Sequence, residues 1–218
     1  MEKIKVDNLS FSYPSSDKLA LDSVSLSIPE SEFVVLCGKS GCGKSTLLRH
    51  LKKSMNPYGN KFGSVCFDGE EIEEMNDRDA ASKIGYVQQN PDNQLVTDKV
   101  WHELAFGLES LGYSNSVIKR RVAEMASYFG IQTWFRKSVS ELSGGQKQLL
   151  NLASVMAMQP EVLILDEPAS QLDPIAARDF LSTVHRLNRE LGVTIVISEH
   201  RLEEIFPLAD RAIVMDEG

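Results

Sequence analysis

The sequence is 218 residues long, with 42% hydrophobic and 25% charged residues, which is ordinary globular usage and excludes a disordered or fibrous chain. Asp and Glu number 31 against 23 Lys and Arg, and the net charge of −8 argues against non-specific binding to nucleic acid. No apolar run approaches the roughly 18 to 20 residues of a membrane span and no hydrophobic signal core opens the chain, so we expect a soluble cytosolic protein without a nucleic-acid partner.

The apolar pattern predicts one α/β unit. Residues 4–6, 25–28 and 64–67 alternate polar and apolar side chains, which favours a half-exposed antiparallel sheet. Elsewhere, short continuous apolar runs alternate with longer amphipathic stretches, the pattern of a buried parallel sheet covered by helices. The predicted parallel strands are 33–37, 84–87, 162–165, 193–197 and 212–215, and the predicted helices are 44–53, 147–158 and 174–191. Residues 98–140 have mostly helical patterning and predict a helical insertion.

A phosphate-binding motif follows the first buried strand. The pattern G-x-x-x-x-G-K-[ST] is matched by Gly38-Lys39-Ser40-Gly41-Cys42-Gly43-Lys44-Ser45. Glycines let such a loop turn its backbone N–H groups toward phosphate oxygens. We expect the Lys44 amine to bind the β- and γ-phosphates and the Ser45 hydroxyl to bind Mg²⁺. Chance produces this match in roughly one chain in a hundred of this length, and its position between a strand and a helix makes chance a poorer explanation.

Two segments elsewhere in the chain add to the evidence for a phosphate-binding site. The strand at 162–165 ends in Asp166, which suits a Mg²⁺ partner, and Glu167, which could polarise an attacking water. The serine and glycines of residues 142–146 precede a predicted helix and form a second anion-binding end. Alone, the paired acids would be solvated surface and the Ser-Gly-Gly segment a helix cap. Together with the phosphate loop, they point to a nucleotide enzyme with two phosphate cradles.

With these motifs in this order, the sequence resembles the ATP-binding cassette (ABC) family over essentially its whole length. Residues 38–45 resemble Walker A, 162–166 Walker B, 142–146 the signature loop and 170–173 the D-loop, which contains Asp173. By this resemblance the catalytic residues are Glu167, His200, Gln89 and Lys44, and the Mg²⁺ ligands are Ser45, Gln89 and Asp166. The ATP-binding residues are Tyr13, Gly38, Lys39, Ser40, Gly41, Cys42, Gly43, Lys44, Ser45 and Thr46. The signature loop that would act on the ATP of a second subunit comprises Ser143, Gly144, Gly145 and Gln146.

Two of these assignments have a plainer alternative. Tyr13 would stack on adenine, but a single aromatic residue with Phe11 nearby is also a common strand-end surface residue. His200 would be the switch histidine, and a lone histidine is usually structural or solvated. Its place just after a buried strand favours a ligand contact, because parallel sheets present ligands at the carboxyl ends of their strands.

The resemblance implies an α/β P-loop NTPase core with a parallel sheet, an N-terminal antiparallel β subdomain and an inserted α-helical subdomain. Residues 1–218 would be a single ABC ATPase domain. Within it, 1–88 and 146–218 would form the RecA-like core with the antiparallel β subdomain, and 89–145 the Q-loop and helical subdomain.

Three segments indicate a branch of the family. Residues 89–95 (QNPDNQL), 105–108 (AFGL) and 198–204 (SEHRLEE) resemble the ATPases of energy-coupling-factor importers for vitamins, vitamin precursors or metal ions. The resemblance implies ATP hydrolysis with Mg²⁺ in a dimer, with a second ATPase half that is identical, different or fused in a longer chain. The turn-like ending at 216–218 suits an excised first half. Integral membrane subunits would be the other partners, at the cytoplasmic face of the membrane, and a separate membrane protein would select the substrate.

Two other functions remain open. A soluble ABC ATPase of translation or DNA repair is disfavoured by the compact segment between the phosphate and signature loops and by the lack of basic linkers. A regulatory subunit without turnover is disfavoured by Glu167 and His200. Gln171 and Leu149 stand where the family commonly has a small residue and an arginine, so the turnover rate is left open.

Overall fold

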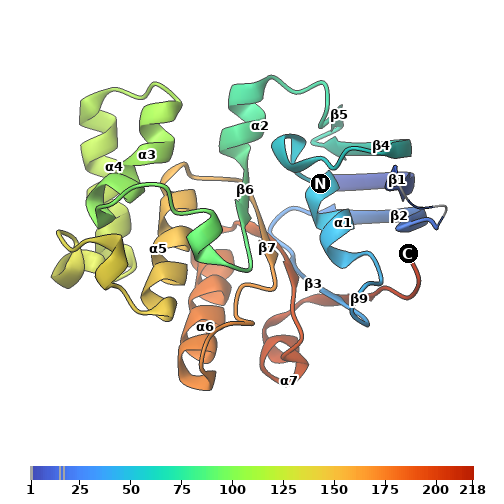
Figure 1. The fold of residues 1–218 in the computed structure, drawn as a ribbon. Coiled ribbons are helices and arrows are strands. Elements are labelled where there is room, and N and C mark those ends of the chain that lie inside the picture. The colour runs from blue at the N-terminus through green and yellow to red at the C-terminus, as the bar shows by residue number, and fades with distance from the viewer. Residues whose placement is uncertain (1, 15, 17) are drawn as a thin grey trace.

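Two β-sheets organise the chain. The computed structural model describes residues 2–14, 16 and 18–218. The antiparallel sheet has the order β2-β1-β4-β5, formed by β1 (Glu2–Ser12), β2 (Leu21–Pro29), β4 (Asn60–Phe67) and β5 (Glu70–Glu71). The parallel sheet has the order β6-β7-β8-β3-β9, formed by β3 (Phe33–Cys37), β6 (Ile84–Val87), β7 (Val162–Asp166), β8 (Thr194–Ser198) and β9 (Arg211–Val214) (Figure 1). The predicted α/β class with two separate sheets is confirmed.

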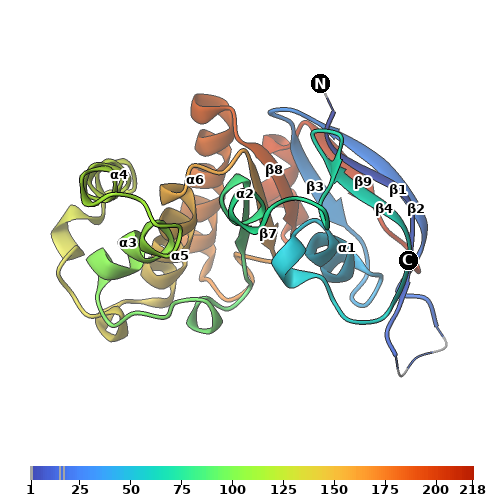
Figure 2. The ribbon, with the colours of Figure 1, turned by 90° about the horizontal axis from the view of Figure 1, so that it is seen from above.

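Helices surround the parallel sheet. They are α1 (Lys44–His50), α2 (Asp77–Lys83), α3 (Val100–Ser110), α4 (Asn115–Tyr128), α5 (Gly144–Ala157), α6 (Pro174–Leu191) and α7 (Leu202–Ile205). Short 3₁₀ turns lie at Lys53–Met55, Pro91–Asn93, Ile131–Trp134, Val139–Glu141 and Phe206–Leu208. Figure 2 shows α3 and α4 at one end of the molecule and the antiparallel sheet at the other. No helix in the described part of the chain is both long and apolar enough to cross a membrane.

The core has two parts because the parallel strands are buried on both faces. In β3, Phe33 and Val35 pack with the helices α3 to α6, whereas Val34 and Leu36 face α1 and the antiparallel sheet. This alternation is the period of two that a strand imposes on its side chains.

The boundaries of two predicted helices differ from the structure. The helix expected over 44–53 ends at His50, because Lys52 takes an extended conformation. The helix expected from 147 begins at Gly144, capped by Ser143. Residues 98–140 are mostly helical, as expected: they contain α3, α4 and two 3₁₀ turns, with one isolated bridge between Lys99 and Ser138. The expected boundary at 145/146 falls in the first turn of α5, and the division into subdomains stays a prediction.

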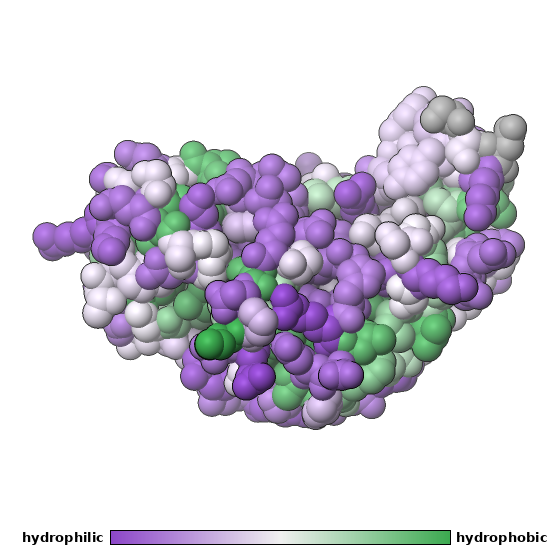
Figure 3. All heavy atoms as spheres, turned by 60° about the horizontal axis from the view of Figure 1, so that its bottom comes forward, coloured by the Kyte–Doolittle hydropathy of each residue, from purple (hydrophilic) through white to green (hydrophobic). Residues whose placement is uncertain are grey.

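All five parallel strands end at the same edge of their sheet. The loops that follow β3, β6, β7 and β8 therefore meet there, where open α/β sheets bind ligands. Figure 3 turns the lower face of Figure 1 toward the viewer and shows that its middle is mainly hydrophilic.

Candidate active site

The loop between β3 and α1 has the backbone that its glycines predict. Gly38, Gly41 and Gly43 all have positive φ angles, of 147°, 80° and 102°. A Cβ atom on Gly38 would lie 2.2 Å from the carbonyl oxygen of Met215, and one on Gly43 would lie 2.5 Å from that of Ala20. A side chain at either position would therefore displace the backbone, so the curled phosphate-loop shape depends on these glycines.

Lys44 is held within this loop. Its ammonium group donates to the carbonyl oxygens of Gly38 at 2.9 Å and Lys39 at 3.1 Å, and the residue is 5% exposed. The loop borders a hollow of about 320 Å³. The hollow is lined by Tyr13, Ala20, Ser40, Gly41, Gly43, Lys44, Ser45, Thr46 and Glu167. Seven of the ten predicted ATP-binding residues thus line one hollow. The other three are Gly38, Lys39, which is exposed, and Cys42, whose side chain is buried.

Asp166 sits where three hydroxyl groups converge. Its Oδ1 accepts hydrogen bonds from Ser45 and Ser198, both at 2.9 Å, and its Oδ2 accepts one from Tyr86 at 3.2 Å. Burial, followed by the charge of Asp166, raises the pKa of Tyr86, which keeps its hydroxyl a donor. The adjacent Ser45 hydroxyl and Asp166 carboxylate are the hard oxygen donors that Mg²⁺ prefers, so this pair fits the ion. Gln89, the third predicted ligand, contacts Glu167.

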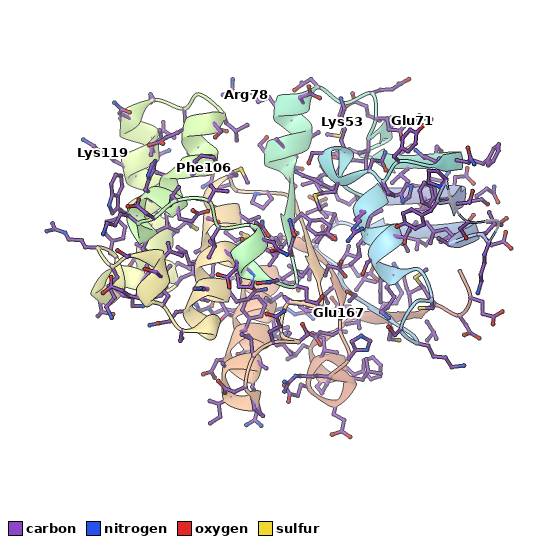
Figure 4. All side chains as sticks on the ribbon, in the orientation of Figure 1. Lys53, Glu71, Arg78, Phe106, Lys119 and Glu167 are labelled. Atoms are coloured by element: carbon purple, nitrogen blue, oxygen red, sulfur yellow. The ribbon has the colours of Figure 1, made fainter. Side chains whose placement is uncertain are left out.

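Glu167 meets two other predicted residues. Its Oε1 lies 2.7 Å from His200 Nε2, and its Oε2 accepts a hydrogen bond from Gln89 Nε2 at 3.3 Å. Its backbone has φ of 46°, which is uncommon for a residue with a side chain, and its N–H donates to the carbonyl and hydroxyl oxygens of Ser198. The loops after β6, β7 and β8 thus bring Gln89, Glu167 and His200 together beside the hollow, and Figure 4 marks Glu167 near the end of β7.

Tyr13 is fixed by two contacts. Its hydroxyl lies 3.2 Å from Thr46 Oγ1, and its ring meets the ring of Phe11 edge-on at 4.9 Å. Tyr13 therefore lines the hollow as part of the packed structure and is not an isolated strand-end side chain.

The predicted second cradle lies apart from the first. Ser143 caps α5: its hydroxyl accepts from the Gln146 N–H at 3.3 Å, and its own N–H donates to Gln146 Oε1 at 3.0 Å. Gly144 is exposed, with open space where a Cβ would be. Ser143 lines a hollow of about 260 Å³, and Gly144 lines another, of about 100 Å³, together with Gln89. Neither hollow shares a lining residue with the hollow at Lys44. Asp173 caps α6 and also lies outside the Lys44 hollow.

Three residues at this edge were not predicted as site residues. Ser198 and Tyr86 bind the Asp166 carboxylate, and Glu199 binds the loop after β7. Ser198 ends β8 and Tyr86 lies in β6, on either side of β7. Their position near the ends of neighbouring strands was the available signal, but strand order is needed to place them beside Asp166.

Comparison with known proteins identifies relatives for nearly the whole chain. The model of the ABC transporter family matches residues 21–170. A candidate ABC transporter ATP-binding protein of Bacillus thuringiensis is 52% identical over 98% of this chain, and one of Methanosarcina acetivorans is 43% identical over 99%. The chain spans only 39% and 34% of the length of these two relatives.

Solved structures have the same fold. CbiO1 from Clostridium perfringens, part of the ABC transporter complex cbiONQ, is 31% identical with a TM-score of 0.89, and the match covers all of this chain and 86% of CbiO1. The ATP-binding cassette MJ0796, in a dimeric post-hydrolysis state bound to ADP and Pi, is 25% identical with a TM-score of 0.83. That match covers 99% of this chain and 95% of MJ0796.

Proposed function

The chain belongs to the ABC transporter family and is an ABC ATPase, and on that premise we propose that it powers a membrane importer as one half of an ATP-sandwiched dimer. The observation that carries the proposal is the convergence of Lys44, Asp166 and Glu167 at one edge of the sheet. Glu167 lies between His200 and Gln89, next to the Ser45–Asp166 pair.

This geometry supports a separate role for each of these residues. Lys44 would bind phosphate oxygens, and Ser45 with Asp166 would hold Mg²⁺, which would supply positive charge against the phosphates when bound. Glu167 orients or deprotonates the attacking water, since it is the carboxylate on the rim of the hollow. His200 and Gln89 hold the Glu167 side chain in place through their contacts with its two oxygens.

The separation of the two cradles supports the dimer. Ser143 and Gly144 line hollows other than the one that contains Lys44, so they would complete the nucleotide site of another subunit. The dimeric MJ0796 structure is consistent with this arrangement. The second half is a copy of this chain, a different ATPase or a fused domain, and the greater length of the relatives leaves room for fusion.

We further propose a vitamin, a vitamin precursor or a metal ion as the cargo. The support is the similarity to CbiO1 together with the segments 89–95 and 198–204. The chain would then bind integral membrane subunits at the cytoplasmic face of the membrane. The alternative, a soluble ABC ATPase of translation or DNA repair, would purify without membrane subunits.

We call the proposed nucleotide site that two subunits form together the composite site. It can be tested with a variant that binds ATP but does not hydrolyse it, so that the ATP-bound dimer accumulates. Glu167→Gln removes the base and one negative charge beside the γ-phosphate, so ATP should persist and hold two halves together. We expect this variant to be a dimer with Mg-ATP and a monomer without it, measured by light scattering in the presence of the natural second half.

A second substitution tests the signature loop. Gly144→Arg adds a bulky cation without removing the Ser143 cap, because the space beside Gly144 is open. It should abolish the ATP-dependent dimer and spare ATP binding, whereas Ser116→Arg in the first turn of α4 should leave the dimer intact. A Glu167→Gln protein that stays monomeric with ATP and the second half would show that the composite-site proposal is wrong.

A further inference from the structure

Glu199 is buried more deeply than Asp166. It is 1% exposed, and its carboxylate accepts three backbone hydrogen bonds. Oε1 accepts from the N–H of Ala169 at 2.9 Å, and Oε2 accepts from the N–H groups of His200 at 2.9 Å and Arg201 at 3.3 Å. Within the described residues, no basic side chain forms an ion pair with it.

These hydrogen bonds join two loops of the proposed active site. Ala169 lies two residues after Glu167, in the segment that leads to Asp173 and α6, while His200 and Arg201 follow β8. The Arg201 guanidinium adds a second link by donating to the carbonyl oxygen of Leu172 at 2.8 Å. The segment 168–172, hereafter the β7–α6 loop, is therefore tied to the His200 loop at both of its ends.

A carboxylate suits this position for a specific reason. All three groups that face it are N–H donors, and an ionised carboxylate is a pure acceptor with two oxygens. A glutamine has one acceptor oxygen, and its NH₂ group would face a backbone N–H on one side or the other. A charge without a basic partner is costly to bury, so the hydrogen-bond geometry accounts for its presence here better than packing does.

We propose that Glu199 is a positioning residue that fixes the β7–α6 loop against His200 and thereby sets the contact between Glu167 and His200. It acts through Ala169 and the His200 backbone and does not touch nucleotide. The inference rests on the proposed ATPase role of Glu167. It goes beyond that role because it assigns the alignment of Glu167 with His200 to Glu199, a buried residue outside the Walker and signature motifs.

The test is Glu199→Gln in the purified protein, assembled with the second half and the membrane subunits that co-purify with it. Because the loss of one acceptor releases one loop, kcat should fall by about tenfold to a hundredfold, as small misplacements of catalytic groups do. KM and the Kd for ATP should change less than about twofold, since Lys44 and Ser45 are untouched. In a His200→Ala background the same substitution should have little further effect, because the pair it aligns is already lost.

Glu203→Gln is the matched control, because Glu203 is an exposed glutamate on the same segment and should keep wild-type kinetics. If Glu199→Gln does not fold, Arg201→Met decides, because it removes the link to Leu172 and leaves Glu199 in place. It should lower kcat alone. An unchanged kcat, or equal effects on kcat and KM, would overturn the positioning role. Failure of the proposed function would be a distinguishable result, because the wild-type protein itself would then show no ATPase activity.

Discussion

At the scale of single residues, His50 closes a ring of contacts with Phe11, Tyr13 and Thr46, the last two of which line the hollow at Lys44. Its Nδ1 lies 2.8 Å from the carbonyl oxygen of Thr46, and its ring meets that of Phe11 at 4.7 Å. Phe11 in turn contacts Tyr13, whose hydroxyl returns to Thr46. His50 is 2% exposed, and its Nε2 has no partner among the described residues.

This environment makes stability depend on pH. Burial lowers the pKa of His50 below its usual value of 6.5, despite the opposing hydrogen bond with Thr46. Between the lowered pKa and 6.5 the unfolded chain binds more protons than the folded one, so stability is lost as pH falls below about 6.5. His50→Phe keeps a ring against Phe11 and removes the titration. From pH 7 to 5, urea unfolding should show wild type losing more stability than His50→Phe.

His102→Phe serves as the control, because His102 is only half-buried on α3 and should leave the wild-type slope in place. Parallel pH curves for wild type and His50→Phe would contradict the prediction.

Site residues differed in how far the sequence could predict them. The phosphate loop and the acids at the end of β7 are contiguous sequence patterns, so the sequence was enough to predict Lys44, Asp166 and Glu167 as site residues. Ser198, Tyr86 and Glu199 contact residues that are 30 to 80 positions away in the chain. Such contacts depend on strand order and loop geometry, which spacing does not specify.

At the scale of elements, the strands were easier to predict than the ends of the helices. The buried strands are continuous apolar runs, and β6 and α6 have the predicted bounds. The helix α2 was not predicted, because Ala80 is its only buried residue and gives no apolar periodicity. The early end of α1 has a tertiary cause, since Lys52 leaves the helix to reach α2.

Lys52 joins these two elements. Its ammonium group donates to the carbonyl oxygens of Ala80 at 2.8 Å, Ala81 at 3.1 Å and Ile84, at the carboxyl end of α2. Burial lowers the pKa of Lys52 to about 8. Between pH 8 and 10.5 the unfolded chain retains a proton that the folded chain has released, so stability rises with pH across that window.

Replacement of this lysine should therefore be more harmful in alkali. At pH 7, Lys52→Met should lower the free energy of unfolding by about 1–3 kcal/mol, because the buried carbonyl groups lose their hydrogen-bond donor. The difference in free energy of unfolding between wild type and Lys52→Met should increase by up to about 3 kcal/mol between pH 8 and 10.5, at 1.36 kcal/mol for each pKa unit. Denaturant unfolding across this range measures the gap. Lys119→Met on α4 should show no such trend, and a gap for Lys52→Met that narrows with pH would refute the assignment.

At the scale of the whole molecule, the segment 89–95 is tied to the helix that carries the signature loop. Asp92 pairs with Lys147 at 2.6 Å, and Gln94 accepts from the Gln88 N–H at 2.9 Å and from Asn151 at 3.0 Å. Lys147 and Asn151 both lie on α5. We propose that membrane subunits contact this segment. A subunit that moves it would then also move α5 and, with it, the predicted second phosphate cradle.

The same contacts limit which residues can be substituted to test docking of a membrane subunit. Asp92 is engaged by Lys147, and Leu95 packs against the core, so changes at either would disturb the fold of this chain. Val96 and Phe106 are better probes, because they are apolar and 63% and 43% exposed. They follow the 89–95 segment, and Figure 4 marks Phe106 on α3.

We expect Val96→Glu combined with Phe106→Glu to reduce co-purification of the membrane subunits by at least about tenfold, since a charge buried at an apolar contact costs several kcal/mol. Nucleotide binding should not change, because neither residue lines the hollow at Lys44. Quantitative mass spectrometry of the purified complex, alongside ATP binding, makes the measurement. Phe62→Glu on β4 is the matched control: Phe62 is 70% exposed on the antiparallel sheet, and its change should leave the complex intact. Full retention of the membrane subunits by the double variant would place their docking surface elsewhere.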